Sequence, residues 1–578
     1  MVQIDRYNFR LDVIENEVRS LMHWGQDVGD NWPVVYILNN DEEAYVGETV
    51  NAATRFEQHL QNPDRQKLTT IQIVTDKDYN KSVILDLESF LIKHMGADGK
   101  YLLQNGNSGL SDHEYYRRSE YEERFYTVWD ELKKKGIVKS SILEIENSAL
   151  FKYSPYKSLG KEQIEVENSI LETLIQLEPT GKNATIVVNG GAGTGKTILA
   201  IYLLKQIVDD FDNTQPGHED ERYEEEASYT NYLCDEAFRS INKVGIVFPQ
   251  KSLRMSIKEV FSSIRGLSPD MVMTPAEVVK NYDRTGEKFD LLIVDEAHRL
   301  KYRDKGTITG YQAYANTNRM LGLNEKKGNE LDWILRCSRN RIFFRDELQT
   351  VRPCDISKSV FDTTVQAEKN AVVVHKTLKS QWRCEGGDKY IRYMRDILFS
   401  NDTKYLKIDN YDLRLYENCS QMISDIKKKN SEIGLCRVAA GFAWPWDRKD
   451  MSKYTIKIDD HSYRWNTTDE NWIGRPGSVN EIGCIHTVQG YDLNYAGIII
   501  GKDLQYDPVK KCMFSNKANY YDVKGKSTLA NDPKLLCDYI RNIYLTLLTR
   551  GIKGTYVYVC DEPLREFFKQ YLPCRESN

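Results

Sequence analysis

The chain has 578 residues, of which 40% are hydrophobic and 11% aromatic, so it can form about two to four packed domains and is not a disordered protein. No segment approaches the ~20 apolar residues of a membrane-spanning helix, and the first residues lack the apolar stretch of a signal peptide, so we expect a cytoplasmic protein without membrane contact. The formal net charge of -6 excludes nucleic-acid binding by bulk positive charge but allows a local basic groove, and the 11 cysteines favour neither a disulfide framework nor a zinc site.

Residues 1–145 predict a small α/β domain with an N-terminal helix and a C-terminal helical linker. Two short apolar runs flank a polar turn at residues 39–43, which is typical of a β-hairpin. The other elements follow from apolar spacing and capping residues. In chain order we expect a helix within 5–28, strands at 34–38 and 44–46, a helix to about 60, a strand at 71–74, and helices at 81–95 and 115–139.

From about residue 154, strands and helices alternate, as in parallel sheets with crossover helices. The remaining length fits two nucleotide-binding units, which we place at 146–370 and 371–578. The acidic run at 209–229 is interpreted as a solvated loop inserted in the first unit. The strands expected in that unit are 185–188, 244–248, 291–294 and 341–344.

Residues 190–197 read GGAGTGKT, follow a predicted strand, and fit the phosphate-loop pattern G-x-x-x-x-G-K-[ST]. Glycines let backbone N–H groups converge on phosphate oxygens at a helix N-terminus, while the lysine neutralises the β- and γ-phosphates and the threonine hydroxyl ligates Mg²⁺. We therefore predict an ATP·Mg²⁺ site formed by Gly190, Gly191, Gly193, Thr194, Gly195, Lys196 and Thr197.

Two carboxylates, Asp295 and Glu296, end the apolar strand at 291–294. The first is expected to hold Mg²⁺, and the second to orient and deprotonate the attacking water. This arrangement favours a nucleoside-triphosphate hydrolase over a kinase or a passive nucleotide binder.

Over about residues 155–560 the chain resembles superfamily 1 helicases, in particular the helicase-like family that includes the C-terminal domain of Schlafen proteins. The resemblance implies two RecA-like domains. Gln163, in Lys-Glu-Gln, is similar to the glutamine that reads adenine. Residues 342–349 are similar to the third motif, whose Gln349 would sense the γ-phosphate, although this chain has Arg345 where the family has glycine.

Three later segments resemble the fourth to sixth motifs of that family. They contribute Arg383 in 381–383, Gln489 in 486–492 and Arg550 in 545–550. The resemblance implies that both arginines reach across the interdomain cleft and place positive charge on the γ-phosphoryl transition state. Taken singly, such residues also occur as helix caps, turn residues or surface cations, so their order along the chain carries the interpretation. The aromatic residues Phe442, Trp444, Trp446 and Trp465 could stack on bases, but we favour a core role.

The predicted hairpin contains Tyr36 and the triplet Tyr45-Val46-Gly47, followed by Arg55 ten residues after Tyr45 and His59 four after Arg55. A spacing of four puts Arg55 and His59 on one helical face. With Glu88 and Asn105 further on, residues 33–110 resemble GIY-YIG nucleases, although the first triplet lacks Gly and Ile. Asn107 competes with Asn105 for the late asparagine.

The nuclease resemblance implies phosphodiester hydrolysis with one divalent ion, Mg²⁺ or Mn²⁺, on Glu88. Arg55 would stabilise the extra negative charge, and a tyrosine or His59 would accept the proton of the attacking water. The choice between Tyr36 and Tyr45 stays open, and a tyrosine base needs a pKa lowered by a nearby cation. Glu48, directly after the glycine, would repel phosphate.

These observations predict an α/β protein in which a metal-dependent endonuclease is fused to an ATP-hydrolysing helicase or translocase. Its partner would be nucleic acid, with DNA favoured over RNA, and a homo-oligomer or a partner protein is compatible with this organisation. Such fusions resemble bacterial anti-phage defence systems. The alternatives are a repair or recombination helicase-nuclease, and an ATP-gated nucleic-acid-binding sensor that does not unwind strands.

Overall fold

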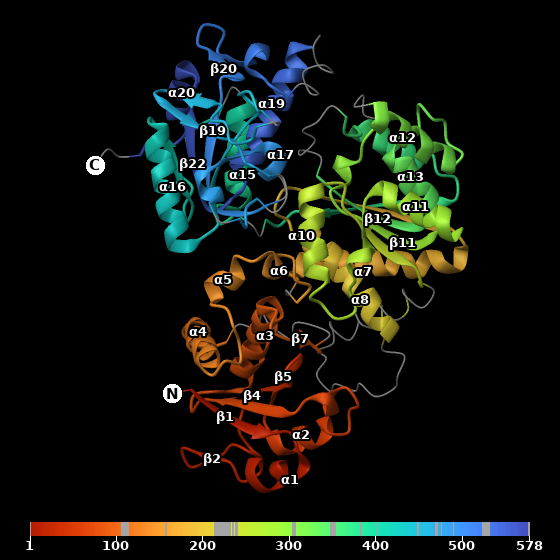
Figure 1. Ribbon diagram of the computed structural model, residues 1–578, viewed down its shortest axis with the longest axis vertical. Helices are drawn as coiled ribbons and strands as arrows, with labels where there is room; N and C mark the ends of the chain where they lie inside the picture. The colour runs from red at the N-terminus through yellow and green to blue at the C-terminus, as the bar shows by residue number, and fades with distance from the viewer. Residues whose placement is uncertain are drawn as a thin grey trace. The chain divides into compact units, whose positions relative to one another are not determined.

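The computed structural model is an α/β protein with three main sheets (Figure 1). It divides into two compact units: residues 1–160 with 201–218 and 257–269, and the rest of the chain. No helix among the residues described has the length and apolar character to cross a membrane. The structure describes residues 2–105, 115–156, 159–212, 233, 236, 241–302, 308–346, 354–381, 384–400, 403–447, 450–468, 472–475, 477–488, 491–522 and 532–575.

The first unit contains a five-stranded sheet in the order β1-β6-β4-β5-β7, which confirms the predicted β4–β5 hairpin. All its pairs are antiparallel except the parallel β5–β7 pair. Asparagines at positions 51 and 80 cap the helices α2 and α3 by accepting backbone N–H bonds. The elements are β1 (Gln3–Asn8), β4 (Val34–Asn39), β5 (Glu43–Thr49), α2 (Ala52–His59), β6 (Thr70–Thr75), α3 (Lys81–Asp98), β7 (Leu102–Leu103), α4 (Arg118–Lys134), α5 (Ile142–Glu146) and α6 (Ala149–Lys152).

The helix predicted across residues 5–28 is present only over residues 11–18. The chain begins with strand β1, which pairs with β6, and only one short helical stretch follows, α1 (Leu11–Val13) continuing into a π-helical turn (Ile14–Val18). Ile14 and Val18 are buried, so their spacing of four does mark a helical turn, but that turn ends before the small hairpin of β2 (Met22–His23) and β3 (Gln26–Asp27).

The first sheet of the second unit is wholly parallel, in the order β10-β9-β11-β12-β8-β13. All four predicted strands are present. β13 pairs with β8 along its whole length, so the second parallel domain starts after residue 378 and not at 371. The strands are β8 (Asn183–Gly190), β9 (Val244–Val247), β10 (Val272–Met273), β11 (Phe289–Val294), β12 (Ser338–Arg345) and β13 (Ala371–Leu378); the helices are α7 (Lys161–Leu177), α8 (Lys196–Asp212), α10 (Lys251–Phe261), α11 (Pro275–Thr285), α12 (Ile308–Met320), α13 (Glu330–Cys337) and α14 (Lys358–Gln366).

α8 occupies the start of the predicted acidic loop, up to residue 212, and residues 213–229 of that loop lie outside the described residues.

The second sheet of this unit is also parallel, in the order β14-β22-β19-β15-β18. Trp465 is buried in its core, and Phe442, Trp444 and Trp446 pack against that core, which confirms the favoured core role. The strands are β14 (Asp412–Tyr416), β15 (Cys436–Ala440), β16 (Ile456–Ile458), β17 (His461–Tyr463), β18 (Ile482–Cys484), β19 (Leu493–Ile500), β20 (Leu504–Asp507), β21 (Cys512–Ser515) and β22 (Gly551–Val559); the helices are α15 (Gly387–Phe399), α16 (Cys419–Ile433), α17 (Ile485–Val488), α19 (Pro533–Leu548) and α20 (Glu562–Lys569).

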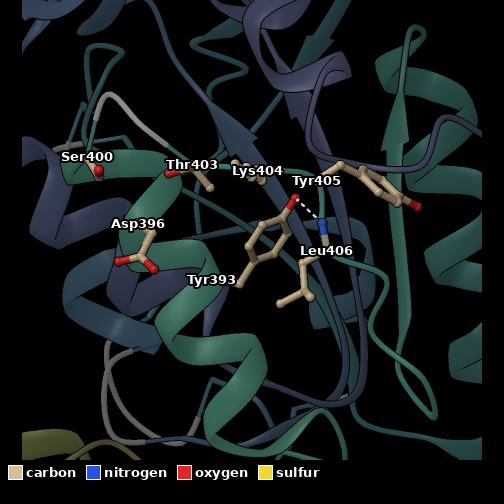
Figure 2. Close-up of a pocket in the computed structure, with 7 residues that line it drawn as sticks. All are labelled: Tyr393, Asp396, Ser400, Thr403, Lys404, Tyr405 and Leu406. Atoms are coloured by element: carbon tan, nitrogen blue, oxygen red, sulfur yellow. Dashed lines mark hydrogen bonds between the residues drawn. The ribbon is translucent and has the colours of Figure 1, made fainter.

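A cavity of about 250 Å³ lies between α15 and the segment 403–406 (Figure 2). The Tyr393 hydroxyl accepts a hydrogen bond from Leu406 N at 3.1 Å and donates to Tyr571 O at 2.8 Å. These bonds tie the segment to α15, so Tyr393 has a structural role here.

Candidate functional site

The phosphate loop follows β8 and leads directly into α8. Its lysine, Lys196, is buried, and its ammonium group donates to the carbonyl oxygens of Gly190 and Gly191 at 2.7 Å each. Gly193 and Gly195 have φ of +81° and +80°, a conformation that residues with side chains rarely adopt. The loop therefore has the backbone path that lets N–H groups at the start of α8 point at an anion.

Thr197 and Asp295 meet at the carboxyl ends of β8 and β11. The Thr197 hydroxyl donates to Asp295 Oδ2 at 2.6 Å, whereas the buried Asp295 Oδ1 has no hydrogen-bond partner in the described structure. Burial, reinforced by the adjacent Glu296, raises the pKa of Asp295 to about 6.

A hydroxyl beside a carboxylate with a spare oxygen fits Mg²⁺, which prefers oxygen ligands and takes most of them from water and phosphate. No group of three or more His, Cys, Asp or Glu side chains suited to a metal occurs among the described residues.

Glu296 has a left-handed backbone, with φ of +51°, and is paired with a histidine that we did not predict to be functional. His298 Nε2 lies 2.9 Å from Glu296 Oε2, and His298 Nδ1 accepts the Asp346 N–H at 3.2 Å. Because Nδ1 accepts, the ring proton is on Nε2, the nitrogen that lies beside the Glu296 carboxylate. Burial acts to raise the pKa of Glu296, but its pairing with His298 and the charges of Lys196 and Arg550 lower it. His298 thus links the carboxylate to the end of β12, and its position two residues after Glu296 was the only signal in the sequence.

Arg550 follows α19 and is buried. Its Nε donates to Thr546 O at 3.0 Å and its Nη1 to Tyr491 O at 3.5 Å. The charges of Arg550 and Lys196 both act to lower the pKa of Glu296. A cavity of about 230 Å³ lies beside the phosphate loop and is lined by Gly191, Ala192, Thr194, Asp346, Lys379, Gln381, Asp388, Ile391, Arg392, Leu545, Thr546 and Thr549.

The start of α7 and the segment that links the two sheets both contact the phosphate loop, and they also contact each other. Gln163 Nε2 lies 3.4 Å from the carbonyl oxygens of Thr194 and Gly195, and Gln381 donates to Ala192 O. Glu162 accepts the N–H groups of Lys379 and Ser380 at 2.8 and 2.6 Å. Three predicted residues, Gln349, Arg383 and Gln489, lie outside the described residues.

The predicted nuclease residues form a second cluster, on the β4–β5 hairpin and the helices α2 and α3. The Tyr36 hydroxyl lies 2.7 Å from His59 Nε2. Burial raises the pKa of Tyr36 well above 10, with Tyr45 and Glu88 adding to the increase and Arg55 opposing it. Glu88 is itself buried. The structure therefore brings Tyr36, Tyr45, Arg55, His59 and Glu88 together.

Arg65 is a member of this cluster that the sequence analysis missed. It is buried, and its Cζ lies 3.7 Å from the centre of the Tyr45 ring. Its Nη1 donates to Gln104 Oε1 at 2.6 Å, and Gln104 in turn donates to Glu43 Oε2 at 2.6 Å. Burial lowers the pKa of Arg65, whereas the two tyrosines raise it. Tyr45 thus lies against the cation of Arg65.

Asn105 and Glu48 are fixed by bonds that their sequence context did not reveal. Asn105 accepts Val46 N–H at 3.0 Å and donates to Val46 O at 2.8 Å, so it holds the backbone of β5 beside Tyr45. The competing Asn107 lies outside the described residues. The buried Glu48 carboxylate accepts from Lys81 Nζ at 2.7 and 2.6 Å, so its charge is compensated and does not act as the lone repelling carboxylate we expected.

Residues 183–561 match the family described as Schlafen group 3, DNA/RNA helicase domain. The uncharacterized protein YPL245W of Saccharomyces cerevisiae is 26% identical over 442 residues, which are 71% of this chain and 90% of that protein.

Among solved structures, two Pif1 helicase structures are similar at 13% and 12% identity. The first describes DNA unwinding at forked duplexes, and the second is a Bacteroides enzyme with ADP-AlF3 and single-stranded DNA. Each match covers 69% of this chain and 92% of the Pif1 chain, with a TM-score of 0.25. The arterivirus helicase nonstructural protein 10 with DNA is 9% identical, covers 70% of this chain and 65% of its own, and has a TM-score of 0.27.

Proposed function

Because this chain belongs to the Schlafen group 3 DNA/RNA helicase-domain family and carries a helicase-like ATPase domain, we propose that it is a nucleic-acid-processing enzyme in which ATP hydrolysis controls a metal-dependent endonuclease. The observation that carries this proposal is the geometry of the phosphate loop, where buried Lys196 donates to the Gly190 and Gly191 carbonyl oxygens and the Thr197 hydroxyl bonds to Asp295 at 2.6 Å. A buried lysine at the start of a helix, beside a threonine bonded to a carboxylate, is suited to a reaction in which negative charge develops on phosphate.

In the nucleotide site, Lys196 would exchange its bonds to the loop carbonyls for bonds to the β- and γ-phosphates. Thr197 and Asp295 would hold Mg²⁺, which neutralises phosphate charge when bound. Glu296, oriented by His298, would accept the proton of the attacking water. Arg550 would stabilise the charge on the transferred phosphoryl group, so hydrolysis would require the two parallel-sheet domains to be together.

In the nuclease site, Glu88 would hold Mg²⁺ or Mn²⁺, and Arg55 would stabilise the charge on the scissile phosphate. Two facts favour His59 over Tyr36 as the proton acceptor. Burial raises the pKa of Tyr36 well above 10, so its phenolate is scarce at neutral pH, and its hydroxyl already lies 2.7 Å from His59 Nε2. Tyr36 would then orient the imidazole.

A cleavage assay on single-stranded DNA, duplex DNA and single-stranded RNA, with and without ATP, tests both sites. Glu88→Ala and Arg55→Ala should abolish cutting and leave ATP turnover unchanged, whereas Lys196→Ala and Glu296→Gln should abolish turnover. The exposed Glu123 and Lys182 provide matched controls as alanine variants. Full cutting by both nuclease-site variants would reject that site, and full turnover by both nucleotide-site variants would reject the other.

We propose DNA as the preferred substrate and anti-phage defence as the setting. A phage challenge that compares the wild type with Glu88→Ala tests the setting, because a repair enzyme would not change plaque numbers. ATP turnover that no nucleic acid stimulates would favour the sensor over the motor.

A further inference from the structure

We infer that Glu162 is a positioning residue of the nucleotide site, and this inference rests on the proposed function. Its carboxylate holds the segment 379–381, which follows β13, beside the phosphate loop. Glu162 lies at the start of α7, directly before Gln163, and the segment leads along the chain to Arg383, the arginine expected on the γ-phosphoryl group. Loss of this hold should therefore slow hydrolysis more than it weakens nucleotide binding.

Both carboxylate oxygens of Glu162 are bonded to the backbone of this segment. Oε1 accepts the Lys379 N–H at 2.8 Å, and Oε2 accepts the Ser380 N–H at 2.6 Å. Successive backbone N–H groups form a concavity that suits an anionic group. Burial acts to raise the pKa of Glu162, but the bonds from Ser380 and Lys379 lower it below its usual value. The carboxylate therefore remains ionised at neutral pH and accepts both bonds.

The segment that Glu162 holds contacts the phosphate loop directly. The Gln381 side-chain amide donates to Ala192 O, and Lys379 and Gln381 both line the cavity beside the loop. From the side of α7, Gln163 Nε2 lies 3.4 Å from two carbonyl oxygens of the same loop. Glu162 thus joins the two segments that approach the loop, the start of α7 and the chain after β13.

A second contact keeps α7 attached to β13 independently of Glu162. Lys376 Nζ donates to the Ser169 hydroxyl, which lies about two helical turns after Glu162 on α7. The helix also packs against both β8 and β13. Removal of the Glu162 carboxylate should therefore leave the helix on the sheet and release only the segment after β13. This separates a positioning role from a role in folding.

Steady-state ATP hydrolysis, ADP binding measured by calorimetry, and hydrogen exchange of the full chain test the inference. Glu162→Ala should lower kcat about ten- to a hundred-fold with ADP affinity within about two-fold of the wild type, since misplacement of a group by about 1 Å can cost this much in rate. Peptides covering 379–381 should exchange about ten- to a hundred-fold faster, as expected for the loss of a hydrogen bond to a charged acceptor, while β8 peptides keep their wild-type rates. Glu162→Gln keeps one acceptor oxygen and should lose less activity than the alanine variant.

The matched control is Glu165→Ala, which removes an exposed carboxylate from the same helix and should keep the wild-type kcat. Equal losses in this control would attribute the effect to the charge of α7 and overturn the inference. Wild-type kcat in Glu162→Ala, unchanged exchange at 379–381, or a weaker ADP affinity with unchanged kcat would overturn it as well. Each of these outcomes leaves the proposed function standing, whereas a wild type that hydrolyses no ATP would overturn that function itself.

Discussion

In the nucleotide site the ionisable side chains contact one another and the loop, whereas in the proposed nuclease site they also lie against aromatic rings. The Thr197 hydroxyl bonds to Asp295, and Glu296 Oε2 lies 2.9 Å from His298 Nε2. By contrast, Arg65 lies on the face of Tyr45, and Tyr36 packs edge-on against Phe56, with 5.0 Å between ring centres. In the proposed function both arrangements would place charge beside a phosphate, but they differ in what one substitution disturbs.

This difference predicts how far the effect of a single substitution should extend in each site. Removing one member of a bonded network leaves its partner buried without compensation, so the loss extends through the network. Removing a cation from an aromatic face leaves the ring packed by its other neighbours, so the loss stays local. The nucleotide site should therefore respond more strongly to single substitutions than the nuclease site.

The largest effect is expected for Arg550→Ala. Its charge reaches Glu296 from the second sheet, and removal of an arginine that stabilises a transferred phosphoryl group costs about 10³-fold in turnover. Steady-state ATP hydrolysis measures this loss. Lys553→Ala, three residues on and exposed, should keep wild-type turnover. Equal turnover in the two variants would exclude Arg550 from the nucleotide site.

A smaller and local loss is expected for Arg65→Ala. If Arg65 positions Tyr45, cleavage should fall about ten- to a hundred-fold in kcat with little change in KM, since misplacement of a catalytic group by about 1 Å can cost this much. Arg65→Lys should recover only part of the activity, because an ammonium group does not stack as a guanidinium does. ATP turnover should not change. A KM increase with unchanged kcat would instead assign Arg65 to substrate binding.

His298→Ala should lower ATP turnover about ten-fold, since Glu296 loses its orientation but keeps its carboxylate. His298→Gln should restore much of the activity, because its amide can still donate to Glu296 Oε2. Full activity in the alanine variant would show that the link between Glu296 and the end of β12 has no role in hydrolysis.

The two sites also differ in how far the sequence predicts them. Residues 190–197 form one contiguous motif after a strand, so local pattern alone located the phosphate loop. The bond from Thr197 to Asp295, 98 residues away, was not predicted. Tyr36, His59 and Glu88 were found only through a family pattern, because tertiary folding brings them together. Arg65 was missed because contact with Tyr45 depends on the path of the chain after α2, and no spacing rule encodes that path.

The errors in the fold have the same origin. β1 has the sequence QIDRYN, whose polar residues have low strand propensity, and it forms a strand because β6 offers an unpaired edge. The sequence of β13 does not show which of the two parallel sheets it joins, and only its pairing with β8 assigns it to the first sheet. Pairing partners far apart in sequence decided both cases.

The smallest effects are expected from a pair of glycine substitutions that compares the packing of the two sites. A Cβ on Gly47 would lie 2.3 Å from the Tyr36 hydroxyl oxygen, whereas a Cβ on Gly191 would meet nothing within 4 Å. Gly47→Ala should therefore lower the free energy of opening of the β4–β5 hairpin by about 1–3 kcal/mol. Gly191→Ala should change the free energy of opening of β8 by less than about 0.5 kcal/mol. Hydrogen exchange of peptides from the two regions measures both values. Adding Tyr36→Phe to Gly47→Ala removes the closest contacting atom, so the double variant should regain part of the loss, and a strictly additive result would contradict direct packing of this ring on Gly47.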